Sequence, residues 1–270
     1  MAFQINTNIG ALEAYQALAK INSNTTQAEL RLATQKRINS VADDTSGYRV
    51  GKELQGQVAI MKAVQGNIGS AKDMLSTAES ALSNINDLLI QIQGKVADAT
   101  DPTKNLTSLA NDVVAIGNEI SSIFSNTTFN STALLSGSGS YTLPTGGDFT
   151  FQTGVSENTT INFGTLNNID LSSLTGATSS SIASIDVSSI QTTVRDALGA
   201  IGNYDQRLNA KNDFLTAAIT NATASVSRLF DADVAQEQLN ATKGQIGSQV
   251  AATALSQLNI LPQQVLRLFQ

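Results

Sequence analysis

Two groupings of neighbouring carboxylates, Asp43–Asp44 and Asp231 with Asp233, are the side chains in this sequence best placed to do chemistry. Paired carboxylates can act in acid–base catalysis or bind Ca²⁺. The chain has no His and no Cys, so the common general bases, nucleophiles and transition-metal ligands are missing. Both groupings interrupt helical patterns, where Asp is a frequent cap and turn residue. We therefore interpret them as caps and expect no enzyme activity, no metal site and no cofactor.

The composition argues against a nucleic-acid or membrane partner. The net charge is −6 and the pI is about 4.6, whereas a general nucleic-acid binder needs basic residues against phosphate. No apolar run approaches the roughly 20 residues of a membrane-spanning helix. The first ten residues lack the basic and apolar regions of a Sec-type signal peptide. Gly66 and Gly69 lie within a helical pattern, so they do not form a phosphate-binding loop.

The element around which the chain is organised is an apolar stripe from Met61 to Ala99, whose positions step by three and four without a slip. This pattern is the a/d seam of a coiled coil. It predicts a helix about 57 Å long, whereas a compact globule of this chain length would be about 48 Å across. We therefore expect an elongated molecule whose stripe packs on partner helices. The rod seam comprises Ile68, Leu75, Leu82, Ile85, Leu89, Ile92 and Val96.

Weaker helical patterns precede and follow this stripe. An N-terminal helix should reach about Ile38, and an irregular connector should lead to the long helix, which begins between Tyr48 and Leu54. Asp101 and Pro102 predict a turn, after which a return helix over Leu106–Ile123 should pair antiparallel with the long helix.

The C-terminal part is also helical in pattern. The helical period returns near Val194, and Phe230–Asp233 forms a second irregular joint. Beyond it, apolar residues step by four from Ile246 to Leu258, and Pro262 should interrupt the helix.

The segment from Ser136 to about Ile190 differs in composition. Phe149–Phe151 and Ile161–Phe163 alternate apolar and polar residues, as half-buried strands do. The Ser, Thr and Gly content of Leu171–Ser184 indicates a loose surface. The predicted fold class is mainly α, an elongated coiled coil or helical bundle from both chain ends with a small β-rich insert.

The apolar stripes allow two interpretations. One is a self-contained helical bundle. The other is an intermolecular interface, because the terminal helices are alanine-rich and weakly striped, and such helices are marginal alone. An interface between copies that does not close on itself produces a filament.

Five motifs resemble bacterial flagellin in the order and spacing of that family. They cover about the first 135 and the last 75 residues. INTNIGALEA resembles the opening of the family, RINSVADDTSG its RINSAKDDAAG, ALSNIN its ALNEIN, FDADV its IQDAD joint and LPQQVLRLF its VPQQVLSLL end. These motifs occupy Ile5–Ala14, Arg37–Gly47, Ala81–Asn86, Phe230–Val234 and Leu261–Phe269.

The resemblance implies a division of the chain into regions. Residues 1–38 and 231–270 would form an inner coiled-coil core domain, 39–54 a spoke, 55–135 and 191–230 an outer-core rod, and 136–190 a short variable surface region. The large outer domains of longer flagellins would be absent. The apolar residues assigned to the polymer core are Leu18, Ile21, Leu32, Ile246, Val250, Leu258, Leu261, Val265 and Leu268.

The resemblance also implies a structural filament subunit for motility, which is exported unfolded by the type III route and self-assembles outside the cell. The expected partners are copies of the same chain, an export chaperone, and hook-associated and cap proteins. Two alternatives are a hook–filament junction protein and a secreted coiled-coil effector or translocator. The PQQVL ending and the N-terminal match favour flagellin over both.

Many flagellins bind a host Toll-like receptor through an Arg, a Leu four residues later and a Glu on the return helix. An ungapped extension of the ALSNIN match places Gln91, Lys95 and Glu119 at these positions. Only the Glu is retained. Gln91 lacks the charged fork of guanidinium, and Lys95 puts an ammonium where an apolar anchor is needed. The resemblance therefore implies weak receptor binding.

Overall fold

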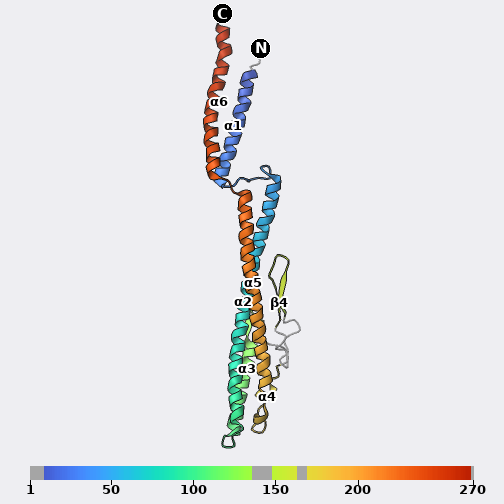
Figure 1. Cartoon of the computed structure of the whole chain (residues 1–270). Coiled ribbons are helices and arrows are strands. Elements are labelled where there is room, and N and C mark those ends of the chain that lie inside the picture. The colour runs from blue at the N-terminus through green and yellow to red at the C-terminus, as the bar shows by residue number, and fades with distance from the viewer. Residues whose placement is uncertain (1–8, 136–147, 163–168, 269–270) are drawn as a thin grey trace. The chain divides into compact units, whose positions relative to one another are not determined.

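The computed structural model describes residues 9–135, 148–162 and 169–268, with side chains as far as Leu258 at the C-terminal end. Helices dominate the described residues (Figure 1). They are α1 (Ile9–Thr34), α2 (Thr45–Asp98), α3 (Leu106–Asn126), α4 (Ser172–Thr175), α5 (Ser188–Phe230), α6 (Val234–Leu268) and the 3₁₀ turn η2 (Ile182–Ser184). The predicted mainly α fold with a small β insert is confirmed.

The β structure consists of two antiparallel hairpins. β1 (Thr128–Phe129) pairs with β2 (Thr132–Ala133), and β3 (Asp148–Gln152) pairs with β4 (Asn158–Asn162). The second hairpin matches the two predicted strands, except that Phe163 lies outside the described residues. The first hairpin was not predicted. Its turn residues Asn130 and Ser131 have φ of 48° and 62°, and an Asn at such a turn is a recognisable hairpin signal.

The chain divides into two units, which are described separately below. Unit 1 contains Met1–Val58 and Thr220–Gln270, and unit 2 contains Ala59–Ile219. Helices α2 and α5 contribute residues to both units. None of the helices in the described part of the chain is long and apolar enough to span a membrane.

The core of unit 2 is formed by helices α2, α3 and α5. The α2 side chains of Ile68, Leu75, Leu82, Ile85, Leu89 and Ile92 are at most 2% exposed, while Val96 is half-buried. Helix α3 contributes Val113 and Ile120, and α5 contributes Val194, Ile201 and Leu208, all buried. The stripe on α2 is therefore covered within this unit, by α3 and α5.

The β3–β4 hairpin is attached to α2 and α5 by polar contacts. Lys211 Nζ on α5 lies 2.5 Å from Glu157 Oε1 in the hairpin turn. Asn67 Nδ2 on α2 donates to the carbonyl of Gln152 at 3.5 Å. The backbone amide of Asn162 donates to Tyr204 Oη at 3.4 Å. The hairpin is thus part of unit 2 rather than a free appendage.

The expectation of a loose surface over Leu171–Ser184 is wrong. Leu171, Leu174 and Ile182 are completely buried, and α4 packs so closely on α3 that a Cβ added at Gly117 would lie 3.1 Å from the Leu174 carbonyl carbon. Three large apolar residues outweigh the small polar ones between them, because each buried Leu or Ile contributes roughly 1.5–3 kcal/mol.

Several helix boundaries also differ from expectation. Helix α1 ends at Thr34, before Ile38, and α5 begins at Ser188, six residues before Val194. Helix α6 continues through Pro262 to Leu268, so the predicted interruption is wrong. A proline removes one helical hydrogen bond, and the Leu and Gln residues that flank it are good helix formers.

Candidate assembly surface

Unit 1 is built around a joint in which the segment after α1 meets the segment between α5 and α6. The backbone amide of Arg37 donates to the carbonyl of Phe230 at 2.6 Å, and that of Ala232 donates to the carbonyl of Gln35 at 3.0 Å. Gln35 adopts a φ of 56°, which turns the chain out of α1. These hydrogen bonds join segments almost 200 residues apart in the sequence.

Asp43 and Asp44, the first carboxylate grouping, hold the connector between α1 and α2 by hydrogen bonds. Asp43 Oδ2 accepts from the backbone amides of Asn39 at 3.0 Å and Ser40 at 2.8 Å, while its Oδ1 accepts from Gln27 Nε2 of α1 at 2.9 Å. The hydrogen bonds from the Ser40 and Asn39 amides hold the pKa of the Asp43 carboxyl below its ordinary value. Asp44 accepts from the amide of Gly47 at 2.8 Å, so it caps α2, which begins at Thr45, before the predicted Tyr48.

The second grouping caps α6 and closes α5. Asp233 Oδ1 accepts from the amides of Ala235 at 3.0 Å and Gln236 at 3.1 Å. Asp231 accepts from the hydroxyl of Ser227. The interpretation of all four carboxylates as cap and turn residues is confirmed. Among the described residues, no cluster of three acidic side chains is arranged to hold a metal ion.

An aromatic contact locks the joint against α2. The Phe230 ring is 3% exposed and packs edge-on to Tyr48, with ring centroids 6.1 Å apart. A Cβ added at Gly51 would overlap the Phe230 ring, so only glycine fits at this point of α2.

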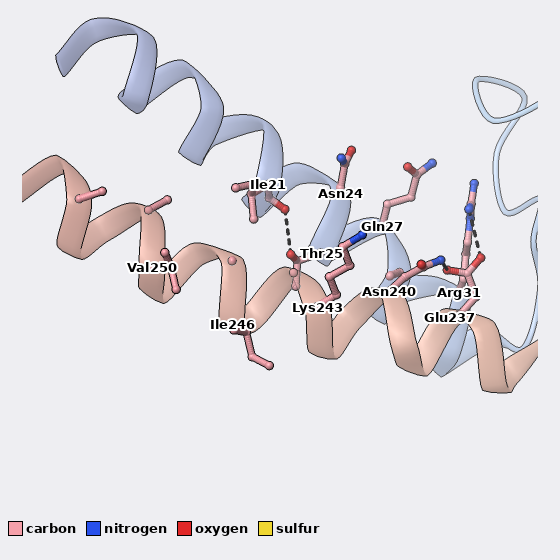
Figure 2. Close-up of a pocket in the computed structure, with 15 residues that line it drawn as sticks. Ile21, Asn24, Thr25, Gln27, Arg31, Glu237, Asn240, Lys243, Ile246 and Val250 are labelled. Carbon is pink, nitrogen blue, oxygen red and sulfur yellow. Dashed lines mark hydrogen bonds and ion pairs between the residues drawn. The ribbon is translucent and has the colours of Figure 1, made fainter. Parts of the chain in front are cut away.

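Beyond the joint, α1 and α6 pair side by side (Figure 2). Arg31 of α1 forms an ion pair with Glu237 of α6 at 3.2 Å. Further along, Gly244 faces Thr25, and a Cβ added at Gly247 would lie 3.6 Å from Ile21 Cγ2. Because these residue numbers fall in α6 as they rise in α1, the helices are antiparallel, and small residues let them approach closely.

An open cavity of about 840 Å³ lies along this helix pair. Apolar residues such as Ile21 and Ala251 and polar residues such as Asn24, Asn240 and Lys243 line it. Arg31 and Glu237 also line this cavity.

Both helices also expose large apolar side chains. On α6, Leu239, Ile246 and Val250 are 58–63% exposed, and on α1, Ile9, Leu12 and Tyr15 are 54–61% exposed. Figure 2 shows Ile246 pointing away from α1. At about 100° per residue, the α6 residues form one stripe opposite the face that meets α1. We call these two sets the α6 stripe (Leu239, Ile246 and Val250) and the α1 stripe (Ile9, Leu12 and Tyr15).

The structure separates the residues assigned to the polymer core. Leu18, Ile21, Leu32 and Leu258 are half-buried, while Ile246 and Val250 are exposed. The side chains of Leu261, Val265 and Leu268 lie outside the described part of α6. The sequence interpretation missed the inner face of α6, whose signal is the run Glu237, Ala241, Gly244, Gly247 and Ala251 at steps of three and four.

The receptor-patch residues lie in unit 2. Gln91 and Glu119 are exposed. Lys95 Nζ lies 2.7 Å from Asp112 Oδ2 on α3, and this hydrogen bond and charge raise the pKa of Lys95 above its ordinary value. The ammonium at this position is therefore held in place by α3.

Long terminal helices that pair with each other and expose apolar faces are typical of proteins that associate through their ends. Residues 5–140 match the model of the bacterial flagellin N-terminal helical region, and residues 183–269 match that of the C-terminal helical region. The chain therefore belongs to the bacterial flagellin family, whose members are structural, non-enzymatic subunits of the extracellular flagellar filament.

Three relatives from other bacteria align with this chain over nearly their full lengths. A flagellin of Bacillus subtilis (strain 168) is 26% identical, with 99% of this chain and 100% of that protein aligned. A flagellin of Listeria monocytogenes is 29% identical, with 98% and 99% aligned. The flagellar filament core protein flaB2 of Brachyspira hyodysenteriae is 28% identical, with 98% and 99% aligned. A crystal structure of Bacillus cereus flagellin covers 61% of this chain and 93% of its own at 23% identity and a TM-score of 0.40.

Proposed function

We propose that this chain polymerises into the flagellar filament by folding and pairing its terminal helices against those of neighbouring copies. The observation that carries this proposal is the presence of two exposed apolar stripes on α1 and α6. An isolated monomer gains nothing from exposing six large apolar side chains on two helices. Contact with another copy would remove them from water, at about 25 cal/mol per Å² buried.

The two stripes differ in residue composition and in the helix that carries them. A contact that joins the α1 stripe of one copy to the α6 stripe of the next is heterologous. Such a contact uses different surfaces on the two partners, so it repeats without closing and generates a helical polymer. The stripes therefore favour a filament over a closed dimer.

The regions inferred from the family carry over to this proposal. Residues 1–38 and 231–270 form the inner core, 39–54 the spoke, 55–135 and 191–230 the outer rod, and 136–190 the variable surface. The nine residues assigned to the polymer core contribute to contacts between copies, with Ile246 and Val250 on the α6 stripe. The rod seam supports each subunit from within.

The chain reaches the filament by type III export in an unfolded state. An export chaperone, hook-associated proteins and a cap protein act before or at the point of assembly. Family membership supports these partners, and the absence of Cys from the sequence is compatible with passage of an unbridged chain.

The test is polymerisation of the purified full chain, seeded or precipitant-induced, followed by sedimentation and negative-stain electron microscopy. The unsubstituted chain should form regular filaments. Ile246→Asp with Val250→Asp should prevent them, because two carboxylates would have to be buried without partners. Ile90→Asp, which adds a charge at an apolar unit 2 residue of 47% exposure, is the matched control and should polymerise. Filaments of normal yield from the double variant would disprove the role of the α6 stripe.

Removal of Asn259–Gln270 provides a second test. We expect a soluble, largely helical protein that does not polymerise, because the removed segment contains Leu261, Val265 and Leu268, which are assigned to the polymer core. Circular dichroism checks the helix content and sedimentation checks assembly. Normal filaments from the shortened chain would show that this segment is outside the polymer core.

A further inference from the structure

We propose that the ion pair between Arg31 and Glu237 determines which partner α6 accepts, by penalising every pairing that does not place a cation beside Glu237. The inference deepens the proposed function, because terminal helices that fold among many copies encounter several wrong partners. Arg31 and Glu237 are specificity-determining residues of assembly in this proposal. Their contribution is selectivity between pairings and not net stability of the correct one.

The geometry makes Glu237 unusual. It is 8% exposed, and among the residues whose burial is described it is the single buried carboxylate. Its Oε1 is bound by Arg31 at 3.2 Å and its Oε2 by Asn240 Nδ2 at 3.3 Å. Figure 2 shows Arg31 and Glu237 pointing toward each other from α1 and α6. Arg31 Nε is also buried and has no hydrogen-bond partner in the described structure.

This ion pair, with side chains 25% exposed at Arg31 and 10% exposed at Glu237, is largely removed from water and is a poor source of stability. Removal of two charges from water costs about as much as their attraction returns, and the unpartnered Nε–H adds a further cost. Removal of only one partner is costly, because a carboxylate that is taken out of water and has no cation beside it keeps its desolvation cost. The pair therefore discriminates between alignments far more than it stabilises the correct one.

The small-residue face of α6 discriminates poorly by itself, and the ion pair acts together with the backbone hydrogen bonds of the joint and the hydrogen bond from Gln245 Nε2 to Glu29 Oε1. The inner face of α6 repeats small residues at Ala241, Gly244, Gly247 and Ala251. A slip of one heptad along such a face exchanges one small residue for another. The same slip that brings Leu18 opposite Gly244 brings Asn24 opposite Glu237, in place of Arg31. Asn24 carries no charge, so the slipped pairing leaves the buried carboxylate without a cation.

The absence of Cys from the chain allows the helix alignment to be read directly by disulfide formation. The Cβ of a residue introduced at Gly244 would lie 3.1 Å from Thr25 Cβ, a few tenths of an ångström below the usual disulfide range of about 3.5–4.5 Å. Thr25→Cys with Gly244→Cys therefore reports the native alignment. Leu18→Cys with Gly244→Cys reports the alignment slipped by one heptad, in a chain that also carries Thr25→Ala, because the Thr25 hydroxyl would overlap the new Cβ in the native alignment. Each cysteine pair is oxidised in the full-length chain, in one sample of filaments and in one sample of soluble protein.

The two cysteine pairs are introduced into three variants of the Arg31–Glu237 ion pair. In Arg31→Leu with Glu237→Leu, helix content is retained, the slipped disulfide rises about tenfold, and the yield of regular filaments falls. In the exchanged pair Arg31→Glu with Glu237→Arg, only the native disulfide forms and filaments return. In Arg31→Leu alone, the native disulfide falls, because Glu237 keeps Asn240 as a hydrogen-bond partner but loses its cation. The control replaces Lys72 and Asp205, an exposed ion pair of unit 2, with leucine; their side chains are 40% and 44% exposed. The ratio of slipped to native disulfide should not change in this variant.

Three results would overturn the inference. The double leucine variant could give only the native disulfide, so that the pair has no role in alignment. It could lose both disulfides, so that the pair acts through stability. The exchanged pair could behave like the double leucine variant, so that side-chain shape and not charge is recognised. Failure of the unsubstituted chain to polymerise would instead refute the proposed function, while the disulfide ratio in soluble protein would still decide the inference.

Discussion

The contact between Gly51 and Phe230 yields a prediction at the scale of single residues. Gly51→Ala should destabilise unit 1 by roughly 1–3 kcal/mol, because the new methyl group overlaps a buried ring that has little room to move. Gly56 lies on the same helix with no atom within 4 Å of an added Cβ. Gly56→Ala is therefore the matched control and should stabilise the helix by about 1 kcal/mol. Thermal unfolding followed by circular dichroism measures both, and equal effects of the two substitutions would contradict the packing argument.

Leu82 is the second residue whose environment makes a sharp prediction. Its side chain is fully buried between Ala78 and Ile85, which are also inaccessible to solvent. Leu82→Asp would bury an unpaired carboxylate or force its protonation, at a cost of several kcal/mol. The melting midpoint of unit 2 should fall by about 10 °C. An unchanged midpoint would mean that water reaches this position.

Residue size explains which positions could be predicted from sequence. The rod seam was readable because large apolar residues alternate with polar ones at steps of three and four. The inner face of α6 was not, because Ala and Gly contrast little with their neighbours. Glu237 was missed for a further reason. A carboxylate is expected to face solvent, and its burial depends on Arg31, which is 206 residues away in the sequence.

At the scale of elements, capping carboxylates give the fold a defined response to acid. Hydrogen bonds from Ser188 to Asp186 at the start of α5, and from Thr103 to Asp101 in the α2–α3 turn, hold the pKa values of both carboxyls below their ordinary range. A lowered folded-state pKa contributes stability above the unfolded value, and this stability is lost as pH falls through the folded pKa. The free energy of unfolding of unit 2 should therefore decline below about pH 5 and stay flat between about pH 5 and 8, where a chain without His has no ordinary titration.

Asp186→Asn tests the origin of this response. The variant should show a smaller decline in stability between about pH 5 and 2, because Asn keeps a capping oxygen but does not titrate in this range. Denaturant titrations at a series of pH values provide the measurement. An identical acid response in both proteins would assign the effect to other carboxylates.

Element boundaries were harder to predict than element types. The hydrogen bond that Asp44 accepts from Gly47 explains why α2 begins at Thr45. From sequence alone, Asp44 and its neighbours suit a turn equally well. Helix α4 and the turn η2 were missed because their stability comes from Leu171, Leu174 and Ile182 packing in unit 2 and not from local helical pattern. Tertiary burial of this kind has no periodic signal in a segment of four residues.

At the scale of the whole molecule, the exposed surface of unit 2 predicts how a host receptor responds to this protein. Weak or absent activation of the flagellin-sensing Toll-like receptor is expected, because Gln91 and Lys95 lack the Arg fork and the apolar anchor of the family patch. Two lost anchors at roughly 2 kcal/mol each would weaken binding about a thousandfold. Gln91→Arg with Lys95→Leu should recover part of the response in a reporter-cell assay on depolymerised protein.

The ion pair between Lys95 and Asp112 supplies a control for this assay. Asp112→Asn frees the Lys95 ammonium without creating an anchor, so it should not restore activation. Strong activation by the unsubstituted chain would show that the receptor recognises a different surface.

The joint of unit 1 has a consequence for the order in which the molecule can be completed. The α2–α3 pair can form as soon as the first half of the chain is free. The joint cannot form at that stage, because its two backbone segments are almost 200 residues apart in the sequence. The same is true of Arg31 and Glu237. In the proposed export of the unfolded chain, unit 1 stays open until both segments have left the export channel. A chain that lacks either Gln35–Arg37 or Phe230–Ala232 cannot form the joint, so the completion of unit 1 requires both halves of the sequence.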